Sequence, residues 1–232
     1  WSSDVCSSDL DQADQAAARL DALQRAVSLF NAVEPGRRGH VTALAELATE
    51  HSTQGRFAQS IATNRQAIAM AQALPQRNEA ELQVLHSNLG VALQQSGDLA
   101  GAATSFGQAA DIAERTSGAG FPTAWMPRSK HARTLHLAGQ RVEADALFAR
   151  LLAQTSGRSD LPDANVVLED AGERLAAEGR PADGLPFSDA DISASIDLIW
   201  RSRSDRYSQM RSLLPPAEAG AKRRVEMSYI GG

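Results

Sequence analysis

The sequence contains little cysteine, few aromatic residues and no long apolar run. Its 232 residues include a single cysteine, Cys6, so neither an intramolecular disulfide nor a cysteine-based metal site can form. No stretch of 18 or more apolar residues occurs, which excludes a transmembrane helix and gives no reason to expect a membrane partner. The 23 basic and 28 acidic residues nearly balance, and nothing in this charge favours nucleic acid.

The sequence is rich in alanine. The chain contains 42 alanines, whereas aromatic residues make up only 5%. Alanine is the best helix former and a poor strand former, so this composition favours closely packed helices. We therefore predict an all-α fold.

The first ten residues differ in character from the rest. They read Trp-Ser-Ser-Asp-Val-Cys-Ser-Ser-Asp-Leu and resemble a translated sequencing adapter. The alternative is a Ser/Asp-rich disordered N-terminus. We interpret residues 1–10 as an adapter artefact, with the natural sequence starting near Asp11 as the C-terminal part of a longer gene product.

Four similar segments repeat along the chain, each marked by a glycine. Gly55, Gly97, Gly139 and Gly179 are separated by 42, 42 and 40 residues. The positions seven before and five after each glycine also carry small residues: Ala48, Gly90, Ala132 and Gly172, then Ser60, Ala102, Ala144 and Gly184. A repeat of this length indicates a stack of structural units.

Each repeat is predicted to be a helical hairpin. Leu44, Leu47, Ala48 and His51 follow the spacing of one helix face, and a second helix follows the glycine. The glycine ends the first helix and turns the chain. The small residues on both helices would allow the two backbones to cross closely.

One repeat carries most of a family resemblance. The segment from His86 to Ala109 resembles a tetratricopeptide repeat (TPR). The matching signature positions are Asn88, Leu89, Gly90, Gly97, Ala102, Phe106 and Ala109. The 42-residue period is similar to kinesin light chain repeats and to repeats of bacterial signalling proteins. Asn64 and His131 depart from the signature, because the family usually has an aromatic residue and a leucine there.

The resemblance implies a right-handed TPR-like α-solenoid of antiparallel helix hairpins. We expect repeats at 41–78, 83–117 and 125–156, with a partial repeat at 165–185 because Pro186 disrupts its second helix. Residues 11–35 are predicted to be the second helix of a truncated repeat. Residues 188–214 are predicted to form C-terminal capping helices, and 215–232 a disordered tail. A frame error after Gly184 is the alternative explanation of the changed composition there.

No catalytic, nucleotide or metal motif was found. His131 and His136 are five residues apart, which is a poor spacing for one metal on one helix face. The adjacent Glu169 and Asp170 point apart on a helix and do not form a catalytic acid pair. We therefore predict that the chain is not an enzyme, has no cofactor and binds no metal or small-molecule substrate.

The resemblance places a partner-binding groove along the first helices of the hairpins. Ser129 and Asp170 are predicted to lie on its exposed stripe. The candidate binding residues are Asn88, Val91, Gln95, Lys130, Arg133, Glu169 and Glu173. Asn88 matches an asparagine that often bonds the ligand backbone in peptide-binding members of the family, and Lys130 and Arg133 are placed to bind a carboxylate. In the alternative, Lys130 and Arg133 pair with Glu169 and Glu173 of the next repeat.

These features predict a cytoplasmic, non-catalytic protein-interaction scaffold that binds a partner peptide or helix. The alternative is the C-terminal regulatory region of a bacterial Ser/Thr kinase or transcriptional regulator whose other domain lies upstream. Residues 200–232 are basic, but a solvated cap helix explains them better than nucleic-acid binding does.

Overall fold

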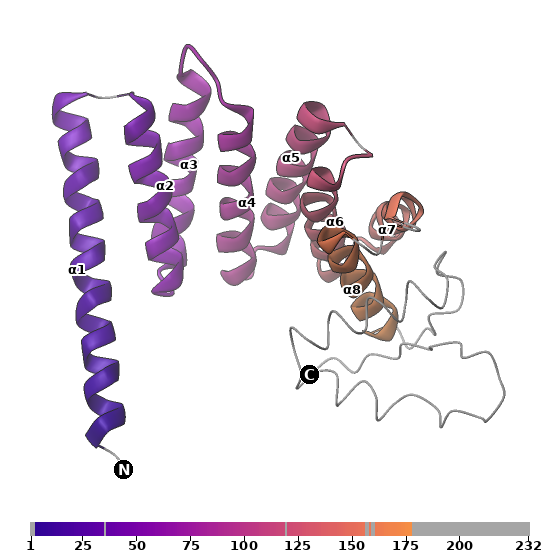
Figure 1. Cartoon of the computed structure of the whole chain (residues 1–232), viewed down its shortest axis with the longest axis horizontal. Coiled ribbons are helices and arrows are strands. Elements are labelled where there is room, and N and C mark those ends of the chain that lie inside the picture. The colour runs from indigo at the N-terminus through magenta and orange to yellow at the C-terminus, as the bar shows by residue number, and fades with distance from the viewer. Residues whose placement is uncertain (1–2, 35, 119, 156–157, 159–160, 178–232) are drawn as a thin grey trace. The chain divides into compact units, whose positions relative to one another are not determined.

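All regular secondary structure in the described residues is α-helix. The computed structural model describes residues 3–34, 36–118, 120–155, 158 and 161–177, and this part of the chain forms eight α-helices and no strand (Figure 1). The helices are α1 (Ser3–Val33), α2 (Arg38–Thr53), α3 (Phe57–Ala73), α4 (Glu79–Gln95), α5 (Leu99–Ser117), α6 (Pro122–Leu137), α7 (Arg141–Thr155) and α8 (Pro162–Ala177). The prediction of an all-α fold is confirmed.

The chain divides into two compact units, each with its own core. The first ends at Ile112 and the second begins at Ala113, so the boundary lies within α5. In the first unit α1 packs against α2, α2 against α3, and α3 against α4. Aliphatic side chains, mostly leucine and alanine, fill its core together with the aromatic ring of Phe106. In the second unit α7 packs against α6 and α8, around the fully buried Trp125 and Phe148.

The turns within the hairpins are made by the predicted glycines. Gly55, Gly97 and Gly139 have φ of 70°, 88° and 82°, a conformation that strains any residue with a Cβ. At the second of these turns, the amide of Asp98 donates to the carbonyl of Leu93 at 2.9 Å and so satisfies one of the last carbonyls of α4. The predicted turns are confirmed at these three positions, and Gly179 lies outside the described residues.

The small residues lie where the two helices of a hairpin meet. Ala48, Ser60, Ala102, Ala132 and Ala144 are fully buried. The Ser60 hydroxyl donates to the Ala48 carbonyl at 2.7 Å, so α2 and α3 are in direct contact there. Between α4 and α5, the ring of Phe106 lies against Gly90, and a Cβ on that glycine would stand 2.8 Å from the ring.

Asn64 stands at the position where the next two hairpins have Phe106 and Phe148. It is 1% exposed, and its amide nitrogen donates to the Ser60 carbonyl at 3.1 Å, but its Oδ1 has no partner. A buried acceptor without a partner destabilises a fold. We expect Asn64→Leu to raise the free energy of unfolding by about 1 kcal/mol in urea denaturation. Gln66→Leu, at an exposed site of the same helix, should not; equal effects would contradict this explanation.

The second unit departs from expectation at its first helix. α6 begins at Pro122, three residues before the repeat expected at 125–156, and Pro127 lies within the helix. Proline is well suited to the first helical turn because its fixed φ fits a helix and its missing N–H has no partner there. Pro127 lies further along, and α6 nevertheless continues to Leu137.

Some expectations fall outside this description. The region 178–185 of the partial fourth repeat, the predicted caps at 188–214 and the predicted tail at 215–232 are not among the described residues. α8 corresponds to the first helix of the fourth repeat. α1 is one continuous helix that includes residues 3–10 as well as the segment 11–33.

Candidate functional site

In the first unit, the first helices of two successive hairpins lie side by side. The Ser52 hydroxyl of α2 donates to the Gln95 side-chain oxygen of α4 at 2.7 Å. Near the other end of the same two helices, Arg38 forms an ion pair with Glu81 at 3.8 Å. Contacts at both ends make α2 and α4 one continuous surface, which we call the first-helix face.

Three of the predicted binding residues lie on this face. Asn88, Val91 and Gln95 are spaced by three and four residues on α4, so they share one side of the helix. Asn88 and Val91 are half-buried, Gln95 is exposed, and Thr49 is exposed on α2. Asn88 makes no side-chain hydrogen bond within the described part of the chain. The face therefore presents amide and hydroxyl groups around one aliphatic side chain.

His51 of α2 and His86 of α4 are buried histidines with shifted pKa values. Burial lowers the pKa of His86 below its usual value. Burial also lowers the pKa of His51, as does the nearby Arg56, while Glu50 acts in the opposite direction. These two lowered pKa values favour the neutral form of both side chains at pH 7.

In the second unit, the predicted basic residues lie on α6. Lys130 is half-buried, and Arg133 is exposed and forms an ion pair with Asp170 of α8 at 3.5 Å. The Ser129 hydroxyl donates to the other oxygen of Asp170 at 2.7 Å. Arg133 thus contacts an acid of the next first helix, although the alternative reading named Glu169 and Glu173.

The predicted exposure of Ser129 and Asp170 is wrong. Ser129 is fully buried and Asp170 is 7% exposed, because α6 and α8 pack directly against each other through these residues. Glu169 and Glu173 also lie on α8, but their side chains are outside the described part of the structure. Asn88, Val91 and Gln95 belong to the first unit, and Lys130 and Arg133 to the second.

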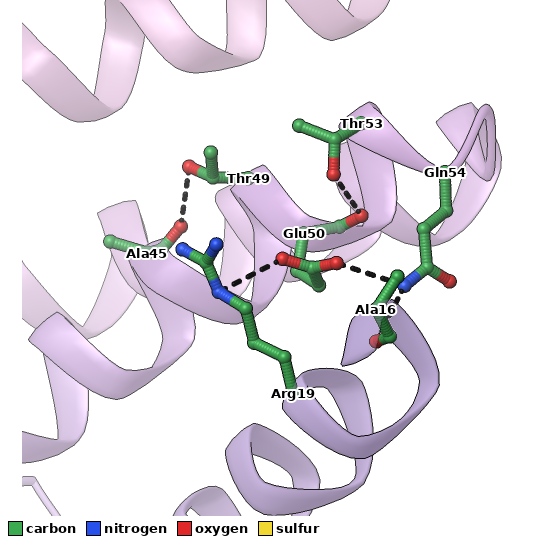
Figure 2. A network of polar contacts seen from close by, with 7 residues as sticks. All are labelled: Ala16, Arg19, Ala45, Thr49, Glu50, Thr53 and Gln54. Atoms are coloured by element: carbon green, nitrogen blue, oxygen red, sulfur yellow. Dashed lines mark hydrogen bonds and ion pairs between the residues drawn. The ribbon is translucent and has the colours of Figure 1, made fainter. Parts of the chain in front are cut away.

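A polar network between α1 and α2 was not foreseen from the sequence. Glu50 is 5% exposed and accepts from Arg19 of α1 at 3.2 Å (Figure 2). Gln54 donates both to Glu50, at 2.9 Å, and to the backbone carbonyl of Ala16, at 3.1 Å. The network fixes α1 onto α2. The repeat could not reveal it, since Ala92 stands in the position of Glu50 one repeat later.

A buried ion pair in the second unit was also missed. Arg128 of α6 is 7% exposed and contacts Glu114 through two nitrogens at 2.8 and 3.0 Å. The partly exposed Arg150 of α7 lies 3.8 Å from the same carboxylate. These three groups connect α5, α6 and α7. The cluster has one carboxylate, Glu114, so it does not contain the two carboxylates of an acid–base pair.

The described residues offer no metal site: they contain no group of three or more histidine, cysteine, aspartate or glutamate side chains arranged around one ion. Among the same residues, no helix is both long and apolar enough to span a membrane.

Comparisons with known proteins agree with this architecture. Residues 87–123 match the family model described as Tetratricopeptide repeat. A kinesin light chain-like protein with nearly identical TPR-like repeats from Podospora anserina is 17% identical, with a TM-score of 0.65, over 83% of this chain and 90% of that one. A variant of that protein gives 19% identity and a TM-score of 0.64, over 86% and 91%. BtubC (BKLC) from P. vanneervenii gives 16% identity and a TM-score of 0.55, over 90% and 98%.

The predicted resemblance to kinesin light chain-like tetratricopeptide repeats is confirmed by these matches. The matched segment contains Asn88, Gly90, Gly97 and Phe106, the residues on which the resemblance was based. The identities to the solved structures are low, so these similarities establish the fold of stacked helix hairpins and nothing further about ligands.

Proposed function

We propose that the chain is a non-catalytic protein-interaction scaffold whose first-helix face binds an extended or helical segment of a partner protein. The observation that carries this proposal is the hydrogen bond between Ser52 and Gln95, because it joins the first helices of two hairpins into one polar surface. Stacked repeats commonly use such extended surfaces for binding.

The chemistry of the face suits a peptide backbone. The amide of Asn88 offers both a donor and an acceptor, which is what one peptide group of a ligand requires. Gln95 and Thr49 supply further polar groups on either side, and Val91 provides an aliphatic contact between them. With no strong charge among these side chains, the face in the first unit selects by hydrogen bonding more than by electrostatic attraction.

The second unit adds basic groups for an acidic segment. Lys130 of α6 is half-buried and offers an amine to a ligand. Arg133 already forms an ion pair with Asp170. We propose that a partner carboxylate binds Lys130 and competes with Asp170 for Arg133. Glu169 and Glu173 of α8 would then bind basic residues of the same partner.

The test is to select binders and locate their contacts. A displayed peptide library is panned against the full chain, and affinities of the selected peptides are measured by calorimetry. We expect Asn88→Ala with Gln95→Ala to weaken binding by about tenfold or more, because each change removes a hydrogen bond from a partly desolvated contact. Lys130→Glu with Arg133→Glu should specifically weaken peptides that contain acidic residues.

The matched control is Gln108→Ala, which alters an exposed glutamine of α5 in the same unit. It should leave the affinity unchanged. Selected peptides that tolerate the Asn88 and Gln95 changes but lose affinity with the Gln108 change would contradict the proposal. Circular dichroism of each variant separates lost binding from lost folding.

A further inference from the structure

One side of α6 combines apolar and basic residues in a symmetrical order. Met126, Lys130, Arg133 and Leu137 are spaced by four, three and four residues, so they lie on the same side of the helix. Met126 is 37% exposed and Leu137 is 48% exposed, and the two basic residues lie between them. We call these four residues the α6 stripe. The stripe spans about 16 Å along the helix axis, at 1.5 Å per residue.

The charge of the α6 stripe is positive, because α6 contains no acidic residue. Arg128 of the same helix is buried against Glu114, and Arg133 pairs with Asp170 at 3.5 Å. Lys130 forms no ion pair with any side chain that the structure describes. The stripe therefore presents an ammonium group beside a guanidinium that already binds a carboxylate.

The same four positions of the preceding first helix have a different character. One repeat earlier, α4 carries Val84, Asn88, Val91 and Gln95 there, and none of these residues is charged. Only the first position is alike, since Val84 is also an exposed apolar residue. The two bases and the last leucine of the α6 stripe are therefore not required by the hairpin itself, because α4 begins a hairpin without them.

We propose that the α6 stripe binds a helix of a partner protein that carries two acidic residues between two apolar ones, at the same spacing of four, three and four. The charges are complementary, because carboxylates suit Lys130 and Arg133. The apolar residues of the partner would remove Met126 and Leu137 from water. This inference rests on the proposed function, since it names the partner of the basic residues in the second unit.

The spacing of the α6 stripe favours a helix over an extended segment. A helix lying along α6 has the same rise per residue, so all four contacts can form together. An extended segment advances about 6.6 Å between side chains of one face, whereas successive positions of the stripe are about 5.5 Å apart. An extended partner would therefore lose register before it reached the far end of the stripe.

The experiment uses the full chain and a synthetic peptide, the Glu probe, with leucine, glutamate, glutamate and leucine at this spacing on one face. A side-chain staple on the opposite face keeps the probe helical, because short isolated helices are only marginally stable. The spacing is the same in both directions, so the probe fits whether the partner helix runs parallel or antiparallel to α6. Fluorescence anisotropy gives the affinity, and we expect the methyl signals of Met126 and Leu137 to shift in NMR.

Two variants test the two kinds of contact. Met126→Ser with Leu137→Ser should weaken binding of the Glu probe by about tenfold or more, because apolar contact is lost. Lys130→Glu with Arg133→Glu should weaken it by about tenfold or more through repulsion between like charges. The second variant should instead prefer a probe with lysines in place of both glutamates, and this reversed preference distinguishes lost contact from lost folding.

Val142→Ser is the matched control, since Val142 is an 87% exposed valine of α7 in the same unit. It should leave the affinity unchanged. Equal affinity in the natural chain and in the Met126/Leu137 variant would overturn the proposal. So would tighter binding of a version of the probe made non-helical by proline, because the partner would then be extended. Self-association in sedimentation that disappears in the Met126/Leu137 variant would also overturn it, because a second copy of the chain would then be the occupant.

The library-selected peptides separate this inference from the proposed function. If they bind the first-helix face while the Glu probe does not bind, the helical acidic partner is ruled out and the scaffold function stands. If neither the selected peptides nor the Glu probe binds, both are ruled out.

Discussion

Gly90→Val is expected to lower the free energy of unfolding by about 3 kcal/mol, because it overpacks a crossing that has no spare volume. Even the first carbon of the new side chain would stand 2.8 Å from the Phe106 ring, closer than carbon atoms approach without displacement. The ring is 1% exposed in the core of the first unit, and close packing of protein interiors leaves a buried ring little volume to move into. Urea denaturation followed by circular dichroism measures the change.

A double-mutant cycle identifies the cause of that loss. Phe106→Leu removes the ring, and in this background Gly90→Val should cost about 1 kcal/mol less than in the natural sequence. Equal costs in the two backgrounds would show that the crossing does not depend on contact between Gly90 and Phe106. The helical hairpin would then need a different register.

Asp170→Ala is expected to destabilise the second unit by about 3 kcal/mol, because it removes the acceptor of a fully buried hydroxyl together with an ion pair. Ser129 donates to one carboxylate oxygen at 2.7 Å, and Arg133 lies 3.5 Å from the other. The loss should appear in thermal and urea unfolding.

The controls for this variant separate the two contacts. Ser129→Ala removes the hydroxyl but keeps the ion pair, so it should cost clearly less than Asp170→Ala. Glu143→Ala alters an exposed acid of α7 and should change stability by less than about 0.5 kcal/mol. If Asp170→Ala behaved like Glu143→Ala, the packing of α6 on α8 through Asp170 would be wrong.

The hairpins could be predicted from the sequence because two kinds of position tolerate few residues. A turn with positive φ favours glycine, and this requirement places Gly55, Gly97 and Gly139 at equal spacing. A close helix crossing needs small side chains on both helices, which explains Ala48 and Ser60 in one hairpin and Gly90 and Ala102 in the next. Both constraints are local and recur in the three described hairpins, so the periodicity of the sequence reveals them.

The polar contacts could not be predicted in the same way. Helical spacing assigns Ser129 to a side of α6, but it does not say how closely the next first helix approaches that side. The approach of α8 buries Ser129, and Asp170, which was expected to be exposed, is a buried structural group. Glu50 was missed for a related reason: its contact with Arg19 occurs only beside α1 and has no equivalent in the later repeats.

Part of the candidate site could be predicted from the sequence and part of it could not. The positions of Asn88, Val91 and Gln95 on one side of α4 follow from helical spacing alone. The Ser52–Gln95 hydrogen bond depends on the packing of α2 beside α4 over a separation of 43 residues, which spacing within one helix does not determine. The likeness in fold to kinesin light chain-like repeats places these residues on first helices but does not identify their ligand.

The most direct test of the account is to locate a selected peptide on the chain by NMR. Intermolecular nuclear Overhauser effects are measured between the peptide and the side-chain amides and methyl groups of the full chain. We predict contacts to the Asn88 amide and the Val91 methyl groups, with Thr49 of α2 on the same face. Contacts confined to exposed residues of the second helices, such as Ala58 of α3 or Gln108 of α5, would contradict binding at the first-helix face.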